Sequence, residues 1–199
     1  QNSNELRASG GFMGSYALIT IDQGKITQFV IEDVYDADGQ WQGFIEAPPG
    51  VKEYLSAGKG LRLPDANWAA DFPSAAPQVK FFIESAKQTP IDGVIALNVQ
   101  VLSQLLEITG PIKLNDYNLT LTADNIDDLL QDRPQIFFPG SRQKVNILTQ
   151  TKTQLALAIN QLPDDQYAKL LQLIQTQIKQ KNLLFFSNNI LLENSLSRL

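Results

Sequence analysis

The sequence predicts an α/β protein in which a mixed central β-sheet carries an N-terminal hairpin and is covered by helices in layers. Two observations predict this class. Strand-like runs surround a glycine-containing turn near the N-terminus, and from residue 72 onward helical and strand-like patterns alternate. The chain has 199 residues, of which 43% are hydrophobic, so it can bury a sizeable core. Because no repeat or low-complexity tract divides it, we expect residues 1–199 to form a single domain.

The first third of the chain predicts a hairpin and then a long irregular segment. Residues 16–22 and 26–35 are rich in β-formers and flank the turn Asp22-Gln23-Gly24-Lys25. The string Asp36-Ala37-Asp38-Gly39 predicts another turn. Residues 40–70 contain several glycines and prolines, which predicts an irregular excursion with a short helix at 51–56. Loops of this length inside a domain are usually functional or mobile.

The remaining two thirds predict helices that alternate with strands. Apolar side chains recur at helical spacing over residues 73–88, 98–109 and 141–181, with a break at Pro163 in the last range. The run Ile91–Leu97 is almost continuously apolar, which predicts a buried central strand. Residues 112–122 and 183–186 also predict strands. A final helix over 188–199 is expected to leave several apolar side chains exposed.

Composition excludes several classes of chemistry. The sequence contains no His and no Cys, which removes Ser-His-Asp and Cys-His catalysis, iron–sulfur clusters, disulfides and zinc sites built from those residues. A metal would have to be a hard, oxygen-liganded cation such as Mg²⁺. With 16 basic and 21 acidic residues the net charge is -5, and no basic cluster favours a nucleic acid as partner. No apolar run reaches the roughly 18 residues that a membrane span needs.

A few residues remain as candidates for chemistry. Arg7 precedes the Gly10-Gly11 segment, which is either a flexible turn or a place where a ligand approaches the backbone closely. Asp71 comes just before a predicted helix, where it can cap that helix or act as a metal ligand or general base. Arg142 and Gln143 open the long predicted helix. A basic residue there opposes the helix dipole, which favours a role in holding an anion.

Several strings along the chain resemble one bacterial family. They are NELRASGGFMGSY at residues 4–16, IEDVYD at 31–36, DANWAADFPSAA at 65–76 and DGVIAL at 92–97, followed by Leu105-Leu106 and Gly110-Pro111-Ile112. Together they closely resemble the envelope-associated family known as domain of unknown function four-zero-one-two (DUF4012), over nearly the whole chain. The resemblance implies an extracytoplasmic protein tethered to the bacterial cell membrane by a segment outside this chain, with these residues as its central fragment.

The order of elements more remotely resembles the LytR-CpsA-Psr family. That family transfers glycopolymers from a polyprenyl-pyrophosphate carrier to peptidoglycan, with Mg²⁺, arginines and aspartates at the phosphates. The resemblance implies that Arg7 matches an arginine of the family and that Arg142-Gln143 match its Arg-Gln pair. The family has a cluster of arginines before that pair, and in this sequence the cluster is reduced to Arg133. Glu32-Asp33 stand where the family has Pro-Arg, so the sequence loses positive charge there.

Two main hypotheses follow from this resemblance. In the first, the protein is an enzyme that acts on polyprenyl-linked phosphate. Its site residues would be catalytic Arg7, Asp71 and Arg142, substrate-binding Gly10, Gly11, Gln143 and Arg133, and Mg²⁺ ligands Asp33 and Asp71. In the second, catalysis is eroded and the chain is an envelope binding or scaffold domain for a lipid, glycan or protein, with a pocket framed by Tyr35, Trp41 and Trp68. A purely structural module that holds partner domains is a third reading. The oligomeric state and the choice between enzyme and binding domain stay open.

Overall fold

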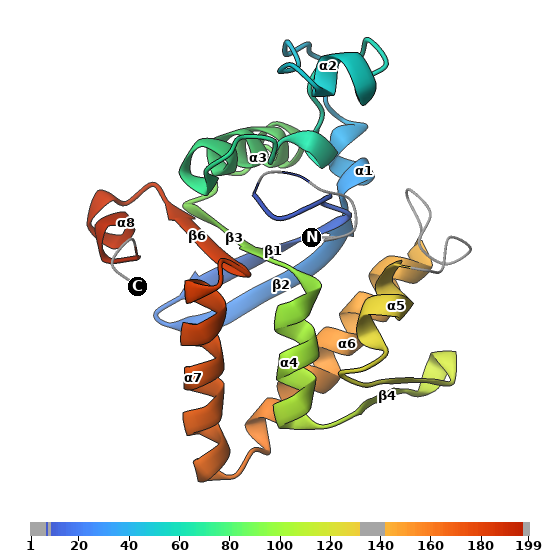
Figure 1. Cartoon of the computed structure of the whole chain (residues 1–199), viewed down its shortest axis with the longest axis vertical. Coiled ribbons are helices and arrows are strands. Elements are labelled where there is room, and N and C mark those ends of the chain that lie inside the picture. Colours follow the sequence, from blue (N-terminus) through green and yellow to red (C-terminus); the bar gives the residue numbers. More distant parts are fainter. Residues whose placement is uncertain (1–6, 8, 132–141, 197–199) are drawn as a thin grey trace. The chain divides into compact units, whose positions relative to one another are not determined.

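The computed structural model describes residue 7, residues 9–131 and residues 142–196. The chain divides into two compact units, each described here by itself. Unit 1 comprises residues 1–14, 34–98 and 178–199, and unit 2 comprises residues 15–33 and 99–177. The chain therefore passes between the units after residues 14, 33, 98 and 177. Figure 1 shows the helices and strands of both units, most of them labelled.

Unit 1 combines a helical layer with one pair of strands. Its elements are α1 (Val34–Asp38), α2 (Val51–Tyr54), the 3₁₀ helix η1 (Leu63–Asp65), α3 (Phe72–Lys87), β3 (Gly93–Leu97), β6 (Leu183–Ser187) and α8 (Ile190–Leu196).

Unit 2 is built from two hairpins and the longer helices. Its elements are β1 (Ser15–Asp22), β2 (Lys25–Asp33), α4 (Val99–Thr109), β4 (Ile112–Leu114), the 3₁₀ helix η2 (Asn115–Tyr117), β5 (Leu119–Leu121), α5 (Ile126–Gln131), α6 (Arg142–Asn160) and most of α7 (Asp164–Lys179).

The predicted N-terminal hairpin is confirmed. Strands β1 and β2 pair antiparallel from Ser15 opposite Asp33 to Asp22 opposite Lys25, with an irregularity between Thr20 and Ile21. The turn residues Gln23 and Gly24 have φ angles of 48° and 77°. Two positive φ values are what a hairpin turn needs to match the twist of its strands, and glycine supplies one of them without strain.

The α/β class is confirmed, but the strands are arranged differently from the expected mixed central sheet. In the described residues they form antiparallel pairs: β1 with β2, β3 with β6 and β4 with β5. The apolar run that predicted a central strand becomes β3, which pairs with β6 alone. Ile95 on β3 is 59% exposed, so this apolar run is not buried on both faces. Its partner strand lies about 90 residues further along the chain, and local patterns do not encode such long-range pairing.

Helix α3 forms the centre of the packing in unit 1. Asp71 caps its N-terminus, Pro73 occupies the first turn, and Gln88 ends it in a left-handed conformation. The helix contacts α1, η1, β3 and β6. The buried side chains on its inner face are Phe72, Ala75, Ala76, Val79, Phe82 and Ile83. These include most of the stripe that helical spacing predicts for residues 73–88.

The core of unit 2 forms where α4, α5 and α6 meet the β4–β5 hairpin. Its buried residues are Val99, Leu106, Ile112, Leu114, Leu121, Ile126, Leu129 and Ile147. Helix α6 also contacts β2, where the Lys152 ammonium lies 4.9 Å from the centre of the Phe29 ring. The hairpin, which would be marginal as two isolated strands, thereby gains a packing partner within its own unit.

Two shorter predictions have different outcomes. The string Asp36–Gly39 does not form a simple turn, because most of it lies in α1. The Asp38 carboxylate accepts a hydrogen bond from the Leu63 backbone N–H at 2.9 Å, which gives this short helix a partner in η1. The expected exposure of the last helix is confirmed, since Ile190 and Leu191 on α8 are both largely exposed.

Candidate functional site

Arg7 forms a nearly buried ion pair with Asp65 in unit 1. Its Nε and Nη2 atoms donate to the same carboxylate oxygen, Oδ1, at 2.9 and 2.7 Å. The two side chains are only 9% and 14% exposed. The guanidinium also lies 5.7 Å from the Phe12 ring centre and 6.0 Å from that of Trp68, which adds cation–π attraction on a partly desolvated charge. The positive charge of Arg7 is thus compensated within the protein.

A second pair of contacts holds the glycine-rich segment beside this ion pair. The Ser9 hydroxyl donates to the Asn67 carbonyl at 2.8 Å, and the Asn67 side-chain amide donates to the Gly11 carbonyl at 2.7 Å. Asn67 is fully buried. Gly10 and Gly11 have φ angles of 127° and 116°, which side-chain-bearing residues rarely adopt. We call Arg7, Ser9, Gly11, Asp65 and Asn67 the N-terminal clasp.

Asp71 lies at the N-terminus of α3 and acts as its cap. Its carboxylate accepts a hydrogen bond from the Ser74 backbone N–H at 3.0 Å, and the side chain is exposed. Extended φ and ψ angles of -115° and 147° are those of a helix N-cap. The capping reading of Asp71 therefore has direct geometric support.

In unit 2, Asp33 forms an ion pair with Lys144. Asp33 ends β2 and is fully buried, and Lys144 extends from the first turn of α6 to place its Nζ 3.1 Å from Asp33 Oδ2. Arg142 and Gln143 belong to the same helical turn and are exposed. The Lys144 ammonium therefore joins Asp33 to the first turn of α6.

The structure divides the predicted site residues between the two units. Arg7, Gly10, Gly11 and Asp71 belong to unit 1, where the Gly10 N–H donates to the Arg7 carbonyl at 3.1 Å. The predicted residues of unit 2 are Asp33, Arg142 and Gln143. The predicted substrate-binding residue Arg133 lies outside the described residues.

The aromatic side chains proposed to frame a pocket fall into two groups within unit 1. Tyr35 contacts Phe12 at a centroid distance of 6.5 Å, and Phe12 and Trp68 both lie against Arg7. Trp41 instead packs edge-on against Phe81 and Phe82, at 5.0 and 6.0 Å. These contacts place Tyr35 and Trp68 close to the clasp.

No cluster of three or more His, Cys, Asp or Glu side chains suited to a metal ion occurs in the described part of the chain. Among the helices described, none combines the length and apolar character required to cross a membrane.

Sequence reasoning missed the partners of its own candidates. Asp65 and Asn67 complete the clasp, yet each lies 58 residues from the side chain that it contacts, Arg7 and Ser9 respectively. Lys144 is 111 residues from Asp33. The Arg7–Asp65 and Ser9–Asn67 contacts share a separation of 58 residues, which becomes apparent only in the folded structure. No local sequence pattern therefore identifies these pairs. The one available signal was that both ends of the clasp fall in strings typical of one family.

Comparisons with known proteins give one match. No curated protein and no solved structure matches the chain. Residues 1–134 match a family model described as "Protein of unknown function (DUF4012)". This segment contains the clasp, the β1–β2 hairpin, α3 and the core hairpin of unit 2. Because the match covers well over half of the sequence, the chain belongs to the DUF4012 family.

Proposed function

We propose that this chain is a non-catalytic, extracytoplasmic domain of the bacterial cell envelope that binds a glycan. The family resemblance supports the extracytoplasmic location. The side-chain contacts described above support binding of a glycan without catalysis. It selects the binding hypothesis over glycopolymer transfer from a polyprenyl-phosphate carrier.

The observation that carries the proposal is the Arg7–Asp65 ion pair. An arginine that binds a pyrophosphate needs charge that is not already compensated. Recruiting Arg7 to a phosphate would leave the nearly buried Asp65 carboxylate without its partner, which is strongly unfavourable. Asp71 caps α3 and Asp33 faces Lys144, so the other candidate acid–base or Mg²⁺-binding groups also have structural partners.

Aromatic side chains near the clasp support a glycan as the ligand. Tyr35 and Trp68 flank the pair formed by Phe12 and Arg7. Aromatic rings combine a large apolar face with a polar edge, a combination that suits the alternating C–H and O–H groups of sugars.

One observation favours the transferase as a second candidate. Arg142 and Gln143 are exposed on the first turn of α6, so their side chains are accessible to a phosphate group in solution. In that function Arg142 would hold phosphate oxygens, and Mg²⁺ held by carboxylates would neutralise charge in the transferred group.

Binding and transfer can be tested with the same protein. The proposal predicts that the purified chain sediments with isolated cell-wall sacculi, equally in Mg²⁺ and in EDTA, and that Arg142→Ala sediments as well as wild type. It also predicts no glycan transfer from a polyprenyl-pyrophosphate-linked donor. Transfer that is lost in Arg142→Ala would replace the proposal by the enzyme.

A further inference from the structure

The irregular excursion after α1 contains a compact closed loop, residues 45–61. Its two ends meet where the Leu61 N–H donates to the Ile45 carbonyl at 2.8 Å. Gly60 allows this closure, because its φ is 78° and a Cβ there would collide with the Ile45 carbonyl oxygen. Loops closed in this way and packed by their own side chains are frequently functional. In Figure 1, α2 and its flanking segments project at one end of unit 1, beyond α1 and α3.

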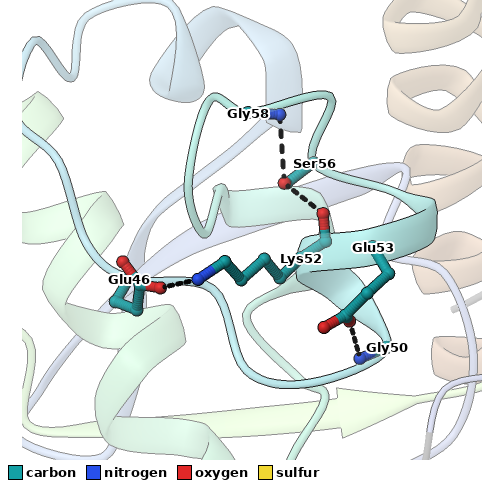
Figure 2. A network of polar contacts seen from close by, with 6 residues as sticks. All are labelled: Glu46, Gly50, Lys52, Glu53, Ser56 and Gly58. Carbon is teal, nitrogen blue, oxygen red and sulfur yellow. Dashed lines mark hydrogen bonds and ion pairs between the residues drawn. The ribbon is translucent and has the colours of Figure 1, made fainter.

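The side chains of Glu46, Lys52 and Glu53 bind groups within the loop. The Lys52 ammonium lies 2.5 Å from a Glu46 carboxylate oxygen. The Glu53 carboxylate accepts the Gly50 N–H at the start of α2, and Figure 2 shows both contacts. The Glu46 contact, by hydrogen bond and by charge, raises the pKa of Lys52 above its ordinary value. Together with Lys59, the loop carries two basic and two acidic residues, so its formal charge is zero.

Polar contacts and buried anchors also fix the backbone of the loop. The Ser56 hydroxyl donates to the Lys52 carbonyl at 3.2 Å and accepts the Gly58 N–H at 3.3 Å, as Figure 2 shows. Within the loop, the side chains of Ala47 and Val51 are buried. A loop held in this way loses little conformational entropy when it binds a partner.

This fixed, neutral loop presents two aromatic rings to solvent. Tyr54 is 85% exposed, the largest value among the exposed large hydrophobic side chains that the structure describes, and Phe44, directly before the loop, is 65% exposed. Hydration of their apolar surface is unfavourable, and a partner that covers the rings would remove this unfavourable free energy.

We propose that loop 45–61, with Phe44 and Tyr54, is a contact surface for an uncharged glycan strand. The inference rests on the proposed glycan-binding function and adds the surface and the charge class of the ligand. Aromatic rings on a preorganised backbone stack on sugar rings, and a neutral surface neither attracts nor repels an uncharged polymer. An anionic lipid surface would select an excess of basic residues, which the loop lacks.

Co-sedimentation with peptidoglycan sacculi tests the inference, using sacculi stripped of protein and of phosphodiester-linked polymers. Tyr54→Ala is expected to weaken binding about fivefold to tenfold, and Phe44→Ala to act in the same direction. Tyr54→Phe keeps the ring and is expected to retain most of the binding. Leu191→Ala is the matched control, because it truncates a side chain that is 75% exposed on α8.

A further variant tests whether the closed shape of the loop matters. The Cβ of Gly60→Ala would lie 2.4 Å from the Ile45 carbonyl oxygen and 3.0 Å from the Phe44 ring, so this variant disturbs both the neck of the loop and that ring. It is therefore expected to weaken binding more than Phe44→Ala does, while the melting temperature of the remaining fold changes little. Because Tyr54 and Phe44 are exposed, their alanine variants are expected to unfold at the wild-type temperature, which separates lost contacts from lost folding.

The remaining outcomes of these binding experiments contradict either the inference about the loop, the assignment of a neutral ligand, or the proposed function. If wild type and Tyr54→Ala bind stripped sacculi equally, the loop is not the contact surface although the proposed function stands. Binding to untreated sacculi alone shows that the ligand is a charged polymer and contradicts the neutral-glycan assignment. Preferential binding to anionic phospholipid vesicles, or to neither kind of sacculus, overturns both the inference and the proposed function.

Discussion

Arg7 and Asp65 lie 58 residues apart in the chain, yet the Arg7 guanidinium donates two hydrogen bonds to a single oxygen of Asp65. The pair joins the N-terminal segment of unit 1 to η1, whose last residue is Asp65. The proposal of a non-catalytic domain rests on this pair, because the guanidinium charge is compensated inside the protein.

Loss of Arg7 is expected to destabilise the fold. Arg7→Ala leaves the Asp65 carboxylate without its partner and should lower the free energy of unfolding by about 2 kcal/mol, less than for a fully buried pair because both side chains keep slight exposure. Chemical denaturation measures this change. Arg142→Ala is the matched control, since Arg142 is exposed and its truncation should cost no more than about 0.5 kcal/mol. Equal stability of Arg7→Ala and wild type would contradict a structural role for the pair.

Asp71 is expected to contribute through helix capping. Asp71→Ala should cost about 1 kcal/mol, whereas Asp71→Ser should retain most of the stability because a hydroxyl also accepts the Ser74 N–H. Thermal unfolding with and without Mg²⁺ distinguishes a cap from a metal ligand. If Mg²⁺ stabilises wild type but not Asp71→Ser, the carboxylate binds the metal and the capping account is incomplete.

The Asp33–Lys144 pair is expected to behave as a coupled unit. Asp33→Ala should cost about 3 kcal/mol, because the mostly buried Lys144 ammonium loses its counter-charge. Adding Lys144→Met removes that uncompensated charge, so the double variant should be less destabilised than the sum of the two single variants. A double-mutant cycle by urea denaturation checks this coupling, and strictly additive effects would show that the two groups do not interact.

Glu84 is expected to make stability depend on pH in the acid range. The Ile91 N–H donates to its carboxylate at 2.6 Å, and this bond, followed by the Lys80 ammonium, lowers the pKa of Glu84. A group with a lowered native pKa stabilises the fold above its unfolded pKa of about 4.3, and this contribution is lost as the pH falls through the native pKa.

The variant Glu84→Gln isolates this effect because it keeps the acceptor oxygen and removes the charge. The stability difference between wild type and Glu84→Gln should therefore be constant near neutral pH and shrink below about pH 4. Unfolding measured across that range tests it, with Glu107→Gln as a control on α4. A difference that grows with acidity would reverse the sign of the account.

Local patterns predicted the elements better than their arrangement. The hairpin followed from strand propensity on both sides of Gln23-Gly24, and α3 followed from the spacing of Val79, Phe82 and Ile83. Both depend on neighbours within a few residues. The pairing of β3 with β6 joins segments about 90 residues apart, so the apolar run at Ile91–Leu97 indicated a strand but not its partner or its exposed face.

In the candidate site, too, contacts between residues far apart in the sequence could not be predicted. The sequence singled out Arg7, Asp33 and Asp71 by their residue types, and the structure supplies a partner for each. For Asp71 the partner is local, so the capping alternative was visible in the sequence. For Arg7 and Asp33 the partners are distant acidic or basic residues. Before folding, such a charge has the same appearance whether it will bind a ligand or an internal counter-charge.

The most direct test of the central claim follows the Arg7 guanidinium itself. The Nε–Hε resonance of Arg7, assigned with Arg7→Lys, can be recorded by NMR while inorganic pyrophosphate and Mg²⁺ are added. The ion-pair account predicts that this resonance stays unchanged up to millimolar pyrophosphate, because Asp65 holds the donor. A saturable shift of the Arg7 resonance would show that the guanidinium leaves Asp65 for a phosphate, and would contradict the non-catalytic assignment.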